Sequence, residues 1–261
     1  MTDAVETVKV VGESAQTALV NLIVVLADTK YFFGRRLSEW IIGAPSLEAG
    51  VACAGIAAEE MGNARVLYPL LEQVPTRRRP VGLEREGDRR RHYCPAYLDE
   101  PLPTWSHAVA ALILIDSAMN VVLEAVAGSG YAPLARRAAR ILDEERFHRT
   151  YAEGRLRELV ASKAGAGALE APLHRLLPEM LMWFGPEGEP GIVELHRERL
   201  LDGDNEQLRQ RWLGYVVPLF EEARVEVGLR RVADRWAYQQ DLPWRHWNPL
   251  QRRLEAAEGG S

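Results

Sequence analysis

Apolar side chains recur along most of the chain at the three- and four-residue spacing of amphipathic helices, and strict alternation is rare. The pattern predicts a first helix over about 13–41 and a second over about 46–72. Between them lies Gly43-Ala44-Pro45, which favours a break, followed by Ser46, a residue type that caps helix N-termini. Pro75 is expected to stop the second helix, because proline cannot continue the backbone hydrogen bonding.

The segment 76–104 differs in character from the helices around it, with seven arginines between positions 77 and 91 and several prolines. Long connections without helical pattern in a compact domain are usually functional or mobile. The planar arginine side chains suit phosphate groups. The alternative is a solvated loop whose own acids balance the arginines.

The pattern resumes with a third helix over about 105–127 and a fourth over about 132–162. Two helices, a long crossover and two more helices form the arrangement of a ferritin-like four-helix bundle. We therefore expect a single all-α domain with additional C-terminal helices. Its expected parts are a core bundle over about 13–162, a glycine-alanine linker at 164–168, accessory helices at 170–183, 190–201 and 204–236, and a tail over 239–261.

Charge and cysteine content narrow the function classes. The 261 residues carry a formal net charge of −5, which argues against a nucleic-acid partner. Two cysteines are too few for a disulfide framework, which indicates a reducing, cytoplasmic setting. The N-terminus lacks a signal-peptide pattern, and the apolar stretch 18–27 is shorter than a membrane span, so no membrane association is expected.

Acidic residues and a histidine at helical spacing are the candidate chemistry. Glu145 and His148 stand at i and i+3 of the fourth helix and share a face. Asp116 lies in the apolar run 111–123, where a carboxylate must be paired or bind a metal. Glu60 lies on the second helix, and its i+3 residue is Asn63.

Two interpretations of these residues stay open. Di-iron carboxylate bundles take one carboxylate from each of two helices and Glu-x-x-His from each of the other two, so the set resembles part of an iron site. Alternatively, Asp116 pairs with a lysine or arginine, and His148 is a hydrogen-bonded core histidine.

Several segments resemble the phenylacetyl-CoA epoxidase subunit family. Those similar to its catalytic subunit are 44–65, 128–148, 180–186 and 204–218, whereas 37–40 and 62–65 are closer to its non-catalytic sister subunit. The resemblance covers most of residues 20–230. It implies a ferritin-like bundle in a multicomponent oxygenase that acts on the ring of an aromatic acyl-CoA.

The resemblance also implies a site in which some ligands are replaced. It places four residues on metal-ligand positions, namely Glu60, Asp116, Glu145 and His148. The family's second-helix histidine is Asn63 here, and its first-helix glutamate falls on Lys30. A protonated ammonium cannot ligate iron and attracts carboxylates instead.

These replacements leave the cofactor and the role open. In the first alternative, Lys30 forms ion pairs with the acids and replaces the charge of the metal. In the second, a single iron remains on Asp116, Glu145 and His148. In the third, Glu59 or Asp28 completes a two-metal site. The cofactor is therefore iron at a partial site, or none. The chain is either a catalytic component that needs a reductase, a scaffold that pairs with a homologous oxygenase subunit, or a different enzyme of the same fold. A homo-oligomer is the other expected assembly.

Overall fold

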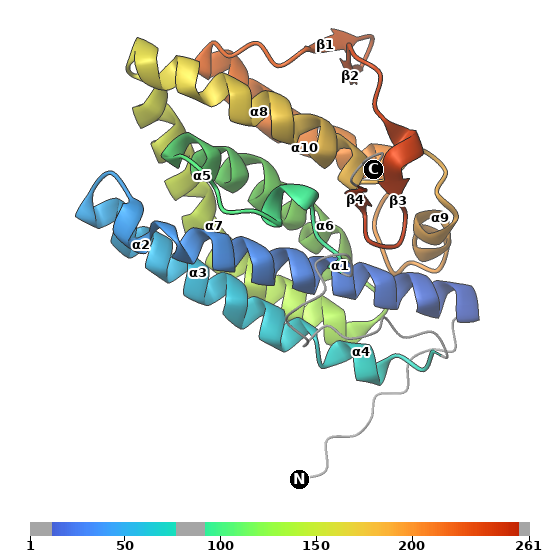
Figure 1. The fold of residues 1–261 in the computed structure, drawn as a ribbon. Helices are drawn as coiled ribbons and strands as arrows, with labels where there is room; N and C mark the ends of the chain where they lie inside the picture. The colour runs from blue at the N-terminus through green and yellow to red at the C-terminus, as the bar shows by residue number, and fades with distance from the viewer. Residues whose placement is uncertain (1–11, 77–91, 256–261) are drawn as a thin grey trace, which may run out of the picture.

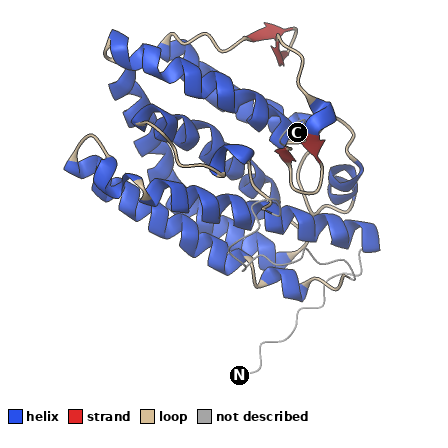
Figure 2. Ribbon diagram, in the orientation of Figure 1, coloured by secondary structure: helices blue, strands red, loops and turns tan. Residues whose placement is uncertain are grey.

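The computed structural model describes residues 12–76 and 92–255. Helices make up most of this part, and strands form only two short hairpins near the C-terminal end (Figure 2). The helices are α1 Glu13–Ser38, α2 Trp40–Gly43, α3 Leu47–Leu67, α4 Leu70–Gln73, α5 Trp105–Ala111, α6 Ser117–Ala127, α7 Ala132–Val160, α8 Lys163–Trp183, α9 Pro190–Arg197 and α10 Asn205–Ala223. A π-helical turn, Leu112–Asp116, joins α5 to α6.

The helices lie in three tiers (Figure 1). The α1–α3 hairpin forms one tier, and the hairpin of α5–α6 with α7 forms the next. α8 packs on α5 and α7, and α10 packs on α6 and α7, so these two helices cover the bundle from the other side. This arrangement confirms the predicted all-α, ferritin-like bundle with additional C-terminal helices.

A core of buried aliphatic and aromatic side chains is continuous across the tiers. Trp212 of α10 is fully buried and donates from Nε1 to Ser117 Oγ at 2.8 Å, which fixes the outer tier on α6. Two helical stretches, 13–38 and 105–127, are long and apolar enough to cross a membrane, but most of each lies buried in the protein. Burial of this kind is typical of core helices in soluble proteins. A cytoplasmic location stays a prediction.

The predicted linker at 164–168 is wrong, because these residues form the first turns of α8. Ser162 caps the helix by accepting a hydrogen bond from Gly165 N at 3.0 Å. A Cβ on Gly165 would lie 2.0 Å from Leu159 O, so glycine is needed where α7 turns into α8. The glycines therefore serve a tight helix-to-helix turn and not a flexible connection.

The predicted helix over 204–236 is correct only in its first half. α10 ends at Ala223, because Arg224 adopts a left-handed backbone with φ 54°. An antiparallel hairpin follows, with strands β1 Leu229–Val232 and β2 Arg235–Tyr238. The side chain of Gln210 donates to Trp236 O and accepts from Trp236 N, both at 2.8 Å, and so holds the hairpin on α10. The second hairpin pairs β3 Trp247–Asn248 with β4 Arg253–Leu254.

The crossover between the two helical hairpins is partly described. Its arginine-rich part, 77–91, lies outside the described residues, so the phosphate-binding interpretation stays a prediction. The following residues run to a short 3₁₀ turn, Ala96–Leu98. The buried carboxyl of Glu179 on α8 accepts hydrogen bonds from Ala96 N and, at 3.1 Å, Tyr97 N.

Glu179 is expected to make stability fall as the pH rises. Burial disfavours the charged carboxylate and raises the pKa of Glu179 to about 7, although the two backbone N–H groups oppose this effect. The native state thus holds the proton more tightly than the unfolded chain does. This stabilisation is complete below the ordinary pKa of 4.5 and is lost as the pH passes through about 7. Between about pH 5 and about pH 8 we expect a loss of about 2–3 kcal/mol.

The control is Glu179→Gln, which keeps the shape and cannot ionise. Urea unfolding of both proteins across this pH range gives the difference in their free energies of unfolding, and other titrating groups cancel in that difference. A difference that stays constant with pH would refute the assignment.

Candidate functional site

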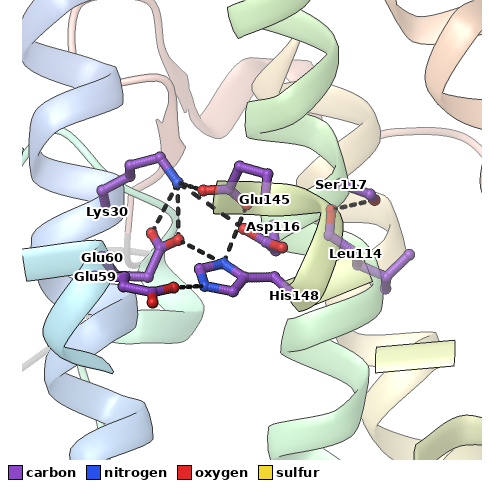
Figure 3. A network of polar contacts seen from close by, with 8 residues as sticks. All are labelled: Lys30, Glu59, Glu60, Leu114, Asp116, Ser117, Glu145 and His148. Carbon is purple, nitrogen blue, oxygen red and sulfur yellow. Dashed lines mark hydrogen bonds and ion pairs between the residues drawn. The ribbon is translucent and has the colours of Figure 1, made fainter. Parts of the chain in front are cut away.

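Five side chains from four helical segments meet in the interior of the bundle (Figure 3). They are Lys30 of α1, Glu60 of α3, Asp116 at the end of the π-helical turn, and Glu145 and His148 of α7. Each is at most 3% exposed. Ligand atoms of the three acids and the histidine all lie within 4.8 Å of one another. Residues far apart in the sequence thus form one buried polar cluster.

Local sequence features bring the helices close enough for this cluster. Gly34 lies one turn after Lys30, and a Cβ there would approach Ala57 O and Glu60 Cβ to 2.9 Å. Glycine therefore allows α1 to pack tightly on α3 beside Glu60. Glu145 and His148 share a face of α7 because they are three residues apart.

Asp116 ends a π-helical turn, an irregularity that frequently occurs at functional sites. The hydroxyl of the following residue, Ser117, donates to the backbone carbonyl of Ile113 and, at 3.4 Å, to that of Leu114. Figure 3 shows the second of these contacts. The turn directs the Asp116 side chain toward the cluster from the α5–α6 segment.

The Lys30 ammonium lies among the carboxylates. Nζ donates to Glu60 Oε1 at 2.8 Å and Oε2 at 2.9 Å, and to Glu145 Oε1 at 2.7 Å. Asp116 Oδ1 lies 4.0 Å from Nζ, beyond hydrogen-bond distance. Burial acts to lower the pKa of Lys30, but the carboxylates of Glu145, Glu60 and Asp116 outweigh it and hold the pKa above its ordinary value. The lysine is therefore a buried cation whose hydrogen-bonding capacity is filled.

Both ring nitrogens of His148 face carboxylates. Nδ1 lies 3.2 Å from Glu145 Oε2 and 3.3 Å from Glu60 Oε1, and Nε2 lies 2.7 Å from Glu59 Oε2. Burial opposes the charge, but the hydrogen bonds to Glu145 and Glu60 outweigh it and raise the pKa of His148 to about 11. In the charged form that these contacts favour, both ring nitrogens carry protons, so a metal ion would have to displace one of them to bind.

Asp116 and Glu145 respond to these surroundings in opposite directions. Burial and the neighbouring Glu145 and Glu60 raise the pKa of Asp116 well above its ordinary value, which favours the protonated form of this carboxyl. Burial also acts to raise the pKa of Glu145, but Lys30 and His148 together bring it far below the ordinary range. Two protein cations thus balance the buried carboxylates.

The remaining candidates lie around the cluster or away from it. Asn63 is buried, and its Nδ2 has no hydrogen-bond acceptor among the described residues. Asp28 accepts from Tyr68 Oη at 2.9 Å and Tyr93 N at 2.8 Å, so it serves the crossover and not the cluster. Glu59 contacts the cluster only through His148. The spacing of residues in the sequence does not show whether Glu59 binds a metal ion or forms an ion pair with this histidine.

A cavity of about 620 Å³ adjoins the cluster between α6, α7 and α10. Asp116 and Glu145 form part of its wall, and Arg146, Arg149 and Arg211 line it as well. Sequence spacing does not indicate this cavity, because α10 closes it and the packing of α10 on α6 and α7 is a tertiary feature. One side of the polar cluster is thus open to a molecule-sized space.

Two comparisons relate the chain to known proteins. A family model described as "Phenylacetic acid catabolic protein" matches residues 1–256. The chain is also similar to one of the subunits of the 1,2-phenylacetyl-CoA epoxidase of Escherichia coli (strain K12), with 26% identity over 186 residues. That alignment covers 70% of this chain and 60% of the relative, so the chain spans less than two thirds of the relative's length.

Proposed function

Because the chain belongs to the phenylacetic acid catabolic protein family, we propose that it is a component of a multicomponent oxygenase for an aromatic acyl-CoA, and that its own site is metal-free. Its relative in Escherichia coli is named as a subunit of a phenylacetyl-CoA epoxidase, which supports the complex and the substrate class. In this proposal the chain is a scaffold, and a homologous subunit supplies the iron and the turnover.

The observation that carries the proposal is the position of Lys30. Its ammonium is fully buried and donates to Glu60 and Glu145, two of the acids expected to hold iron. An iron ion bound to the same carboxylate oxygens would have to displace the ammonium or lie next to it. Two neighbouring positive charges repel strongly in a buried site. The ammonium supplies the charge compensation that a metal would otherwise provide.

The other donors do not fit a di-iron centre either. Such a centre takes Glu-x-x-His from two helices, and the second of these motifs has Asn63 in place of histidine. His148 lies between Glu59 on one side and Glu145 and Glu60 on the other, and these contacts favour the protonated ring. Metal binding would require this ring to lose a proton that three carboxylates retain.

A one-metal site is the second candidate, and the compactness of the donor set favours it. Glu60, Asp116, Glu145 and His148 still offer ligand atoms within 4.8 Å of one another. A single ion there would make the chain an enzyme with altered chemistry, dependent on a reductase. Metal content separates the two candidates directly.

After anaerobic loading with Fe(II) and removal of free metal, the chain is expected to retain less than about a tenth of an equivalent of iron, because an intact site would fill under these conditions. Elemental analysis measures the content, and an active homologue treated in parallel shows that the loading works. Retention of about one equivalent would replace the scaffold with the one-metal enzyme. Oxygenation of an aromatic acyl-CoA by the chain and a reductase alone would also contradict the scaffold proposal.

A further inference from the structure

The β1–β2 hairpin is a small antiparallel sheet on the outer side of the protein, beside α10 (Figure 1). α10 packs against β2, and in the part of the chain that the structure describes β1 pairs with β2 alone. A strand at the edge of a sheet presents a row of backbone N–H and C=O groups to its surroundings. β1 is the edge of this sheet that α10 leaves open.

The register of the hairpin shows which backbone groups of β1 point outward. Opposite residues of an antiparallel pair alternate between hydrogen-bonded and non-hydrogen-bonded pairs. Gln239 N donates to Gly228 O at 2.9 Å, whereas Trp236 uses its N–H and C=O for the side chain of Gln210. Arg231 is the partner of Trp236, so its own N–H and C=O point away from the hairpin on the other side. Gln210 thus pairs with the β2 edge as a strand would, and no described residue does the same for β1.

The hairpin also carries a concentration of positive charge. Residues 229–238 include three arginines and one acid, Asp234. Arg230, Arg231 and Arg235 are all exposed, and none of the three has an ion-pair partner among the described residues. The chain as a whole has a formal net charge of −5, so this local excess differs in sign from the rest of the molecule. Charge complementarity therefore favours an acidic partner.

The two faces of the hairpin differ in character. Side chains alternate between the faces of a strand, so Arg230 lies on the face of Val232, whose partner across the hairpin is Arg235. This face holds two arginines around a valine that is 47% exposed. The other face carries Leu229 and Trp236, which are partly buried against the core. A strand added at β1 would thus meet cations on one face and apolar side chains on the other.

We propose that the β1 edge docks an extended acidic segment of another protein, which adds antiparallel to β1 as a third strand. Its backbone pairs with the outward N–H and C=O of Arg231, which supplies affinity, and its alternate side chains supply specificity. Acidic side chains face Arg230 and, one strand further, Arg235, while apolar side chains lie on the face of Leu229. The inference goes beyond the proposed function, since it concerns neither the buried cluster nor iron.

Fluorescence anisotropy of labelled peptides, titrated with the full chain, tests the docking from the side of the ligand. An eight-residue peptide of alternating glutamate and valine is expected to bind, and the same peptide with lysine in place of glutamate is not. Residues opposite each other in a sheet share a face, so the peptide residue opposite Arg231 is a valine, and its N–H points to β1. N-methyl groups on the valines should therefore weaken binding at least about tenfold, whereas N-methyl groups on the glutamates should not.

Substitutions in the hairpin test the same contact from the side of the protein. Arg231→Pro removes the outward N–H, which takes no part in the pairing with β2, so the hairpin is kept. It is expected to weaken binding about tenfold more than Arg231→Ala, which removes the same charge and keeps the N–H. Arg230→Glu with Arg235→Glu should weaken binding at least about tenfold. The matched control is Arg140→Glu on α7, an arginine whose side chain is 82% exposed, which should bind like the wild type.

Circular dichroism confirms that each variant is folded. Absence of glutamate-valine peptide binding up to about 1 mM would overturn the proposal, and it is the result expected if the arginines only protect the edge from pairing. Equal binding of the peptide methylated on its valines would overturn it as well. Arginines beside an aromatic ring also suit single-stranded nucleic acid. Tighter binding of oligothymidylate than of the peptide, lost on charge reversal but unchanged in Arg231→Pro, would replace strand docking with nucleic-acid binding.

Discussion

Replacing Lys30 with methionine is expected to lower the free energy of unfolding by about 3–5 kcal/mol. Methionine matches the length of the lysine side chain and removes its charge. The change leaves Glu60 and Glu145 buried without the ammonium that donates to three of their oxygens. Breaking a buried ion pair costs this much because the remaining charge stays out of water. The effect would be among the largest for a single substitution.

Denaturant unfolding followed by circular dichroism at neutral pH measures this loss. The control is Arg157→Met, which removes an ion pair of Arg157 with Glu222 at 2.9 Å, where both side chains are about half exposed. Exposed ion pairs contribute about 0–1 kcal/mol, so the control should change little. Equal losses in the two variants would mean that Lys30 contributes no more than a surface residue.

The bundle could be predicted from the sequence because its signals are local. Apolar spacing, Ser46 as a cap and Pro75 as a stop all act within a few residues, and the structure begins α3 at Leu47 and ends α4 at Gln73. Asp116 stood out because an acid in an apolar run needs a partner. Lys30 drew attention only through the resemblance, since nothing in its neighbouring residues shows that it is buried among carboxylates.

The features that could not be predicted depend on tertiary contacts. The hairpin after α10 rests on Gln210, which binds the Trp236 backbone from 26 residues away. The turn at Gly165 depends on how closely α7 and α8 approach. Glu59 is exposed to solvent on one side and reaches His148 on the other, which no helical spacing within α3 indicates. Periodicity assigns a residue to a face of a helix but does not say which side chain of another helix it meets.

The double variant Lys30→Glu with Asn63→His is expected to raise the iron content from less than about a tenth to about two equivalents per chain. The first change removes the cation that occupies Glu60 and Glu145 and adds a carboxylate on α1. The second change places a histidine one turn after Glu60 on α3, in a position whose amide nitrogen has no acceptor among the described residues. Together they supply a carboxylate from each of two helices and Glu-x-x-His from each of the other two.

Iron content after anaerobic Fe(II) loading and visible absorption after exposure to oxygen report the outcome. The matched control is Lys30→Gln with Asn63→His, which also removes the ammonium but adds no carboxylate. If only the glutamate variant takes up iron, the fourth carboxylate is what the wild-type cluster lacks. If both take up iron, a carboxylate at position 30 is not required, and removal of the Lys30 charge together with the added histidine is sufficient. If neither fills while both remain folded, the cluster does not have the geometry of a metal site, and the metal-free character of the chain has a cause other than Lys30.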